Sequence, residues 1–269
     1  KVEGIDIEKA EEEFRTFERR EALFYGEEKK LIKTLIKQAK IMLQKYDVTV
    51  TNPPYMGTKG YSEKLKKYVE SNFKDSKADM FAVFIEKCMQ MTKENRYTSM
   101  ITMPSWMFLS SFENLRNILI KSTSISSLLH MGRGIFGIDW GSVAFTLKLT
   151  KEDIKGNYFR LHKRNFQHIY YEDIAKLLEN TIKNRDYKYN FDSYRDMDGT
   201  MNIPDNSMED GQKLYYNTSQ QDFHKIPGSP IAYWVSDRVK EIFEKSEKLG
   251  DVGDTKVGLG TTNNDKFLR

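Results

Sequence analysis

Residues 52–55, Asn-Pro-Pro-Tyr, combine side chains that could activate an amine for methylation. An exocyclic aromatic amine is a poor nucleophile because its lone pair is delocalised into the ring. Two acceptors that take its two N–H groups would localise that lone pair, and the Asn52 side-chain oxygen and the Pro53 carbonyl can serve as these acceptors. Pro53 and Pro54 fix φ and remove backbone donors. The pattern therefore predicts catalysis that rests mostly on positioning.

Tyr55 adds a flat ring on which a purine can stack, a contact worth about 1–3 kcal/mol per base. The alternative interpretation is a plain turn, because Asn-Pro and Pro-Pro are common in loops. The β-branched run at residues 47–51 favours the functional interpretation. Such a run predicts a strand, and ligands of parallel sheets bind beyond the carboxyl ends of strands.

Strand and helix patterns alternate around this loop. Helices are predicted at residues 29–46, 79–92 and 113–121, and strands at residues 47–51, 97–103, 125–131 and 141–150. This alternation predicts an α/β fold with a mostly parallel sheet. The last strand follows its neighbour too closely for a helical crossover, so that pair should be antiparallel.

The composition is that of an ordinary globular protein, with 269 residues, 39% hydrophobic and 30% charged. A single cysteine, Cys88, excludes an internal disulfide framework and a zinc site built on thiolates. No apolar run approaches the length of a membrane span, so we expect a cytoplasmic protein without a membrane partner. No metal site is expected, because the histidines lack ligand spacing. They are His130, His162, His168 and His224.

Charge is distributed unevenly along the chain. Residues 1–28 hold ten acidic and five basic side chains, so with a total net charge of +4 the remainder carries +9. That surplus permits phosphate contact, although solvated Lys-rich helices explain it equally well. Composition suggests four parts. They are an acidic helical connector (1–28), the α/β part (29–178), a polar insertion or loop (179–225) and a new unit (226–269).

Five stretches resemble the amino-methyltransferases that act on DNA adenine, and most closely the PglX methyltransferases of BREX phage-defence systems. Related type IIG restriction–modification enzymes share the first three. The stretches are residues 46–57, 77–86, 101–109, 129–132 and 227–234. The resemblance implies a Rossmann-like fold that depends on S-adenosylmethionine, with residues 29–178 as the C-terminal part of the catalytic domain. Residues 226–269 would begin a target-recognition region.

The resemblance also implies a reaction and roles for single residues. The methyl group would pass from S-adenosylmethionine to N6 of a flipped adenine in duplex DNA, within a restriction–modification or phage-defence system. Residues 52–55 would hold the adenine, and Phe136 would close on its other face. Asn52 and Phe84 would contact the cofactor, although a core position on an apolar helix face is the alternative for Phe84. Duplex DNA and other phage-defence proteins are the implied partners.

One part of the family pattern is missing. The family carries a Gly-rich strand-to-helix loop for S-adenosylmethionine before Asn-Pro-Pro-Tyr, whereas residues 1–45 contain only Gly4 and Gly26. We therefore expect a sheet truncated on its N-terminal side and an isolated chain that is inactive. The G-x-G-x-x-G at residues 132–137 does not replace this loop, because a strand pattern follows it where a phosphate-binding helix would be needed.

Two other functions stay open. A non-catalytic DNA-binding or scaffold fragment could keep the fold, and a protein-glutamine methyltransferase faces the same problem of a poorly nucleophilic nitrogen. Intact Asn52 and Tyr55 favour the enzyme over the scaffold. The polar insertion and the new unit after residue 226 favour DNA over a protein substrate.

Overall fold

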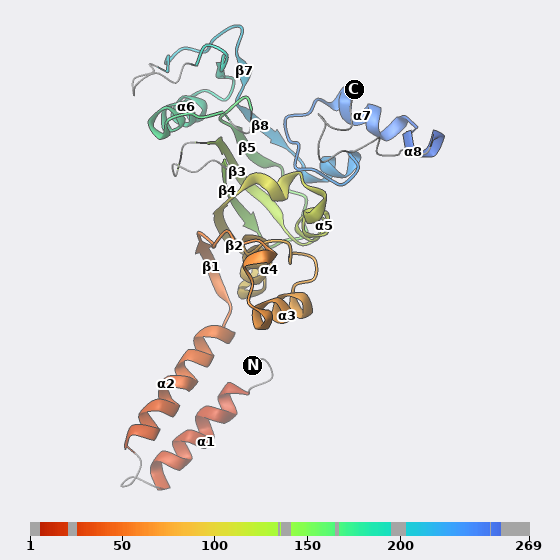
Figure 1. Ribbon diagram of the computed structural model, residues 1–269. Helices are drawn as coiled ribbons and strands as arrows, with labels where there is room; N and C mark the ends of the chain where they lie inside the picture. The colour runs from red at the N-terminus through yellow and green to blue at the C-terminus, as the bar shows by residue number, and fades with distance from the viewer. Residues whose placement is uncertain are drawn as a thin grey trace, which may run out of the picture.

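The computed structural model describes residues 6–20, 26–133, 135, 141–164, 167–194, 203–247 and 249–253. Its centre is a six-stranded sheet with the order β1-β2-β4-β3-β5-β8 (Figure 1). The strands are β1 (Tyr46–Thr51), β2 (Thr92–Thr102), β3 (Ser124–Gly132), β4 (Ser142–Lys148), β5 (Gly156–Arg160) and β8 (Tyr215–Thr218).

Four of these strands, β1, β2, β3 and β5, run in the same direction. The pairs β1–β2 and β3–β5 are parallel, and β4 is antiparallel to both β2 and β3. At the far end β8 is antiparallel to β5. The predicted mixed fold, mostly parallel with an antiparallel β4, is confirmed. The insertion of β4 between β2 and β3 was not predicted, because spacing along the chain does not show which side of a neighbour a returning strand will join.

The main core lies between the sheet and the helices α4 (Met80–Met91) and α5 (Glu113–Ser122), while α3 (Glu63–Asn72) packs in a smaller cluster. Figure 1 shows the three helices on one side of the sheet. Apolar side chains recur along α4 and α5 at helical spacing, and their inner faces are buried. They pack against strand residues in a cluster that includes Phe81, Ile85, Leu119, Leu128 and Phe145. Short 3-10 helices connect these parts. They are η1 (Thr58–Gly60), η2 (Pro104–Met107) and η3 (Ser110–Phe112).

A second core involves α6 (Tyr171–Lys183) and β6 (Lys188–Tyr189), and β7 (Gln212–Lys213) pairs with β6. Tyr187 and Leu214 are fully buried in it. The boundary expected at residue 179 therefore falls inside α6, and β8 from the expected insertion belongs to the main sheet. Composition did not indicate this packing, because tyrosines rather than aliphatic residues provide much of it.

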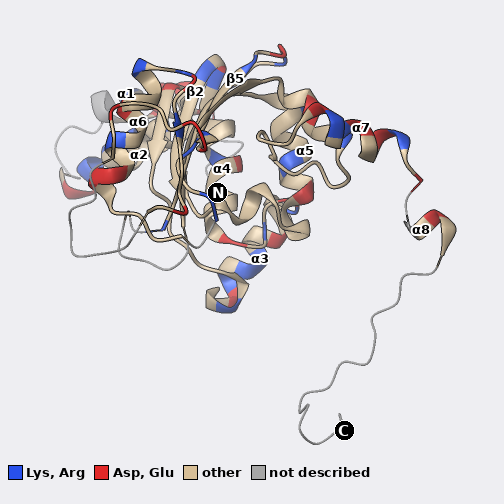
Figure 2. Ribbon diagram, turned by 90° about the horizontal axis from the view of Figure 1, so that it is seen from above, with Lys and Arg blue, Asp and Glu red and all other residues tan. Residues whose placement is uncertain are grey.

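The first part of the new unit expected from residue 226 also packs on the body, since Ile231 and Tyr233 lie in the main core. Before it comes η4 (Gln220–Lys225), and after it come α7 (Asp237–Lys245) and α8 (Leu249–Val252). Charges of both signs alternate along α7 (Figure 2). The division into four parts stays a prediction.

Two helices, α1 (Ile7–Arg20) and α2 (Gly26–Leu43), form an antiparallel pair that projects from the body (Figure 1). No residue of α2 is buried. Beside this pair β1 ends the sheet, and Val48 and Val50 are 57% and 72% exposed. None of the helices among the described residues is long and apolar enough to cross a membrane.

Candidate active site at the Asn-Pro-Pro-Tyr loop

The Asn-Pro-Pro-Tyr loop (residues 52–55) leaves the carboxyl end of β1 beside the carboxyl end of β2. Asn52 is exposed, Pro53 is buried and Tyr55 is half-buried. The Tyr55 hydroxyl lies 3.3 Å from both Asn52 Oδ1 and the Ile101 carbonyl oxygen, and it can donate its one proton to either. Burial raises the pKa of Tyr55, so the hydroxyl remains a donor at neutral pH. The ring is thereby tethered over β2, and it orients the Asn52 amide.

Asp79, the residue before α4, holds the chain that follows the loop. Its Oδ1 accepts hydrogen bonds from the backbone N–H groups of Met56 (3.1 Å) and Phe81 (3.2 Å). The Met80 N–H donates to the Met56 carbonyl at 3.0 Å. Burial raises the pKa of the Asp79 carboxyl, while the hydrogen bonds from Phe81 and Met56 oppose that shift. Sequence reasoning missed this residue, although an Asp before an apolar helix is an N-cap signal.

A mostly apolar cavity of about 620 Å³ lies beside Tyr55. Phe81, whose ring meets the Tyr55 ring edge-on at 6.2 Å, belongs to its wall. Its volume lies within the usual range of small-molecule sites, and its lining suits a planar ring. The lining residues are Ala78, Asp79, Phe81, Met103, Pro104, Ser105, Phe108, Leu109, Ser111 and Phe112.

Asn52 itself borders a different hollow, an apolar groove of about 390 Å³ that Ile101 and Leu129 also line. Tyr55 contacts residues that line both spaces, because its hydroxyl reaches Asn52 and Ile101 while its ring meets Phe81. The loop therefore presents an acceptor oxygen on one side and an aromatic ring on the other.

A family model described as Eco57I restriction-modification methylase matches residues 2–136, which include this loop. The chain belongs to this methylase family. It is 35% identical over 237 residues to the adenine-specific methyltransferase BrxX of Escherichia coli O9:H4 (strain HS), covering 87% of this chain and 17% of the relative. It is 32% identical over 244 residues to the adenine-specific methyltransferase PglX of Lacticaseibacillus casei (strain Zhang), covering 88% and 18%.

The resemblance predicted from the sequence is thus confirmed, and the chain spans less than a fifth of the length of these relatives (17% and 18%). The fold is also similar to the type I restriction-modification system methyltransferase subunit from Streptococcus thermophilus. That alignment has a TM-score of 0.44 at 15% identity, and it covers 71% of this chain and 38% of the other.

Of the two phenylalanines expected in the methylase site, Phe84 lies away from the loop, and the other is not among the described residues. Phe84 is partly buried and packs against a separate cluster that contains Val69 and Phe73 of the α3 region. It lines neither the cavity beside Tyr55 nor the groove at Asn52. Phe136 lies outside the described residues. The cofactor role of Phe84 and the base-facing role of Phe136 stay predictions.

The part of the chain before the loop does not fit the main cofactor contacts of a methylase. Before β1 its described residues form α1 and α2, with Gly26 at the start of α2 and no Gly-rich strand-to-helix turn. An acidic side chain at a strand end, which would bind ribose hydroxyls, is also absent from residues 6–20 and 26–43. The main cofactor contacts expected before the loop are therefore not found among these described residues.

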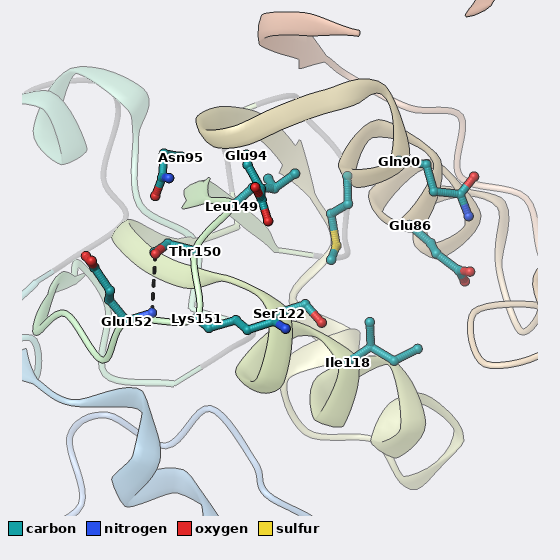
Figure 3. A pocket seen from close by; sticks show the side chains of 11 residues that line it. Glu86, Gln90, Glu94, Asn95, Ile118, Ser122, Leu149, Thr150, Lys151 and Glu152 are labelled. Atoms are coloured by element: carbon teal, nitrogen blue, oxygen red, sulfur yellow. Dashed lines mark hydrogen bonds between the residues drawn. The ribbon is translucent and has the colours of Figure 1, made fainter.

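A cavity of about 760 Å³ lies at the opposite end of the strands, where β2 begins (Figure 3). Glu86, Glu94 and Glu152 line it together with a single basic residue, Lys151. Figure 3 also shows the Thr150 side chain accepting a hydrogen bond from the Glu152 N–H at 3.3 Å. This surplus of carboxylates would repel a phosphate backbone.

Two histidines are buried at the carboxyl ends of β3 and β5. His130 and His162 are both fully buried, with ring centroids 4.2 Å apart. Burial, and next the charge of Arg160, lower the pKa of His162 to about 4. Burial also lowers the pKa of His130 far below its usual value, so both rings are neutral at pH 7. No cluster of three or more potential ligands for a metal ion occurs among the described residues.

Proposed function

We propose that this chain provides the base-binding part of an adenine-N6 DNA methyltransferase in a restriction–modification or phage-defence system. The observation that carries the proposal is the geometry of the Asn-Pro-Pro-Tyr loop in a chain of the methylase family. Tyr55 orients the Asn52 amide and lies beside a ring-sized apolar cavity. The names of the relatives BrxX and PglX support adenine as the acceptor.

The loop acts on the amine through hydrogen-bond acceptors. Asn52 Oδ1 takes one N–H of the N6 amine and the Pro53 carbonyl takes the other, which draws the nitrogen towards tetrahedral geometry and localises its lone pair. S-adenosylmethionine supplies the methyl group when it is bound. The methylated nitrogen then loses a proton to solvent, so the chain needs no strong base. Acceptors placed where charge develops act mainly in the transition state.

The base must leave the duplex for this contact, because N6 is paired inside the helix. The Tyr55 ring offers one stacking face, and the cavity bounded by Phe81 and Phe108 offers apolar walls. Duplex DNA, S-adenosylmethionine and other phage-defence proteins are the partners that we propose. An enzyme that methylates cellular DNA would work in the cytoplasm.

The test is Asn52→Ala in the complete gene product. We expect the methylation rate to fall about 10²–10³-fold, the usual cost of losing one transition-state hydrogen bond, with little change in DNA affinity. Asn52→Asp keeps an acceptor oxygen and should retain more activity. Asn72→Ala, at the end of α3, is the matched control and should methylate normally. Wild-type methylation by Asn52→Ala would contradict the assignment.

A further inference from the structure

The Lys-rich stretch at residues 59–77 is not used by the chemistry above. It contains six lysines and three acidic residues. The helix α3, which lies within it, carries three lysines and two glutamates. The fold gathers four of these lysines, Lys59, Lys66, Lys74 and Lys77, around one cavity of about 610 Å³. The sequence shows that the stretch is basic, and the fold makes it a single concave surface.

The four lysines are available to a ligand. Glu70 and Asp75 share the cavity, so its net charge is positive. None of the four lysines forms an ion pair with any residue in the described ranges. Other lysines of the chain do form ion pairs. The Nζ of Lys93 lies 2.8 Å from Asp47 Oδ2, and the Nζ of Lys240 lies 3.1 Å from Asp222 Oδ2. Four unpaired ammonium groups in one hollow repel one another, and a polyanion relieves that repulsion.

Tyr61 adds an uncharged donor to the same cavity. Its hydroxyl oxygen is buried and has no hydrogen-bond partner among the described residues. Burial, and next the charge of Asp79, raise the pKa of Tyr61 to about 12, so the proton is retained. A buried donor without a partner is uncommon, and a ligand oxygen would satisfy it.

This cavity adjoins the one beside Tyr55, because Ala78 and Ser111 line both. One compartment is apolar and holds aromatic rings, and the other is cationic. Thr58 and Lys59, which follow the Asn-Pro-Pro-Tyr loop closely in the chain, line the second compartment. An apolar space next to a cationic one matches the two parts of a nucleotide, a base and the backbone phosphates that flank it.

We propose that Lys59, Lys66, Lys74 and Lys77 bind the phosphates of the DNA strand that carries the flipped adenine. The choice of DNA as the polyanion rests on the proposed function. Such contacts set the register of the strand over the loop without reading its sequence. The lysines therefore position the strand and do not themselves take part in the chemistry.

The test is Lys66→Gln/Lys74→Gln in the complete gene product, with binding of short labelled duplexes followed by anisotropy over a salt series. Removing one lysine–phosphate interaction should lower the slope of log K against log salt by about 0.9, so the double variant should have a slope smaller by roughly two units. Duplexes of different sequence should be weakened alike. The matched control is Lys33→Gln/Lys37→Gln on α2, which removes the same charge from an exposed helix. It should keep the wild-type slope.

An unchanged slope, or the same decrease in the control, would overturn the phosphate site. This outcome can be separated from failure of the proposed function, because the binding assay needs no methyl transfer. If Asn52→Ala methylates normally while the lysine variant has a reduced slope, the loop chemistry fails and the phosphate site stands. If Asn52→Ala is inactive and the lysine variant binds as wild type, only the phosphate site fails.

Discussion

Two groups of polar side chains lie at the carboxyl ends of strands in the same sheet, and they differ in access. At β1, Asn52 is exposed and its amide is oriented by Tyr55. At β3 and β5, His130 and His162 are fully buried, and neither His162 ring nitrogen has a partner among the described residues. The first group can meet a ligand, and the second cannot without opening the fold.

The difference arises from neighbouring aromatic residues. Phe108 stacks on His130 at 6.0 Å, and Arg160 lies over the Trp234 ring at 4.4 Å, which covers the histidines. At the loop, Pro53 is buried while Asn52 stays in solvent. A place beyond a parallel strand therefore does not by itself make a site, and unusual pKa values can mark structural groups as well as catalytic ones.

The largest expected effect concerns the buried histidines. The pKa of His162 is lowered to about 4 in the fold. The unfolded chain, with a pKa of about 6.5, binds the proton first on acidification. The contribution of His162 to the free energy of unfolding should therefore fall by about 3 kcal/mol between pH 6.5 and pH 4. Urea unfolding over that range would measure this decrease. His162→Leu should remove the contribution of His162 to this dependence, and the contribution of the buried His130 should remain.

The matched control is Leu161→Ala, since Leu161 is an equally buried neighbour without a titratable group. This substitution should lower the free energy of unfolding, and the decrease should not depend on pH. An identical pH dependence in wild type and His162→Leu would show that His162 is not buried in its neutral form. The contrast between a buried group and an accessible loop would then be wrong.

On the open side, Tyr55 should behave as a stacking surface. Tyr55→Ala should weaken binding of a flipped base by about 1–3 kcal/mol, whereas Tyr55→Phe keeps the ring and should bind nearly as wild type. Fluorescence of 2-aminopurine at the target position reports the flipped state. Equal behaviour of the Ala and Phe variants would exclude a stacking role.

Asp79 links the loop to α4, so replacing it tests how much this link contributes to the stability of the fold around the loop. Asp79→Ala should lower the free energy of unfolding by about 0.5–2 kcal/mol through loss of the N-cap. Urea unfolding at neutral pH measures this change. Glu94→Ala, at the acidic cavity at the other end of β2, is the matched control and should unfold as wild type. An equal loss of stability in both variants would mean that Asp79 is an ordinary surface acid.

The smallest expected signal comes from S-adenosylmethionine and the 269-residue chain. The chain lacks the Gly-rich loop expected for the cofactor, so isothermal titration should show very weak binding, because pocket affinity depends on a few well-placed polar groups. Clear micromolar binding would place the cofactor site within these residues and contradict our assignment.

The sequence by itself determined the elements next to the loop and the chemistry within it. β-Branched residues predicted β1, prolines ended it, and the apolar spacing after Asp79 predicted α4, because these signals depend on neighbours a few residues apart. The family resemblance also followed from short local stretches such as residues 46–57.

Only the tertiary structure decided where distant residues meet. It placed β4 between β2 and β3, added β5 and β8 to the sheet, and buried tyrosines of a segment that composition describes as polar. It also placed the His130 ring against the His162 ring and brought four lysines together around one cavity near the loop. No local pattern encodes these contacts, because strand order and cavity walls depend on packing between segments far apart in the chain.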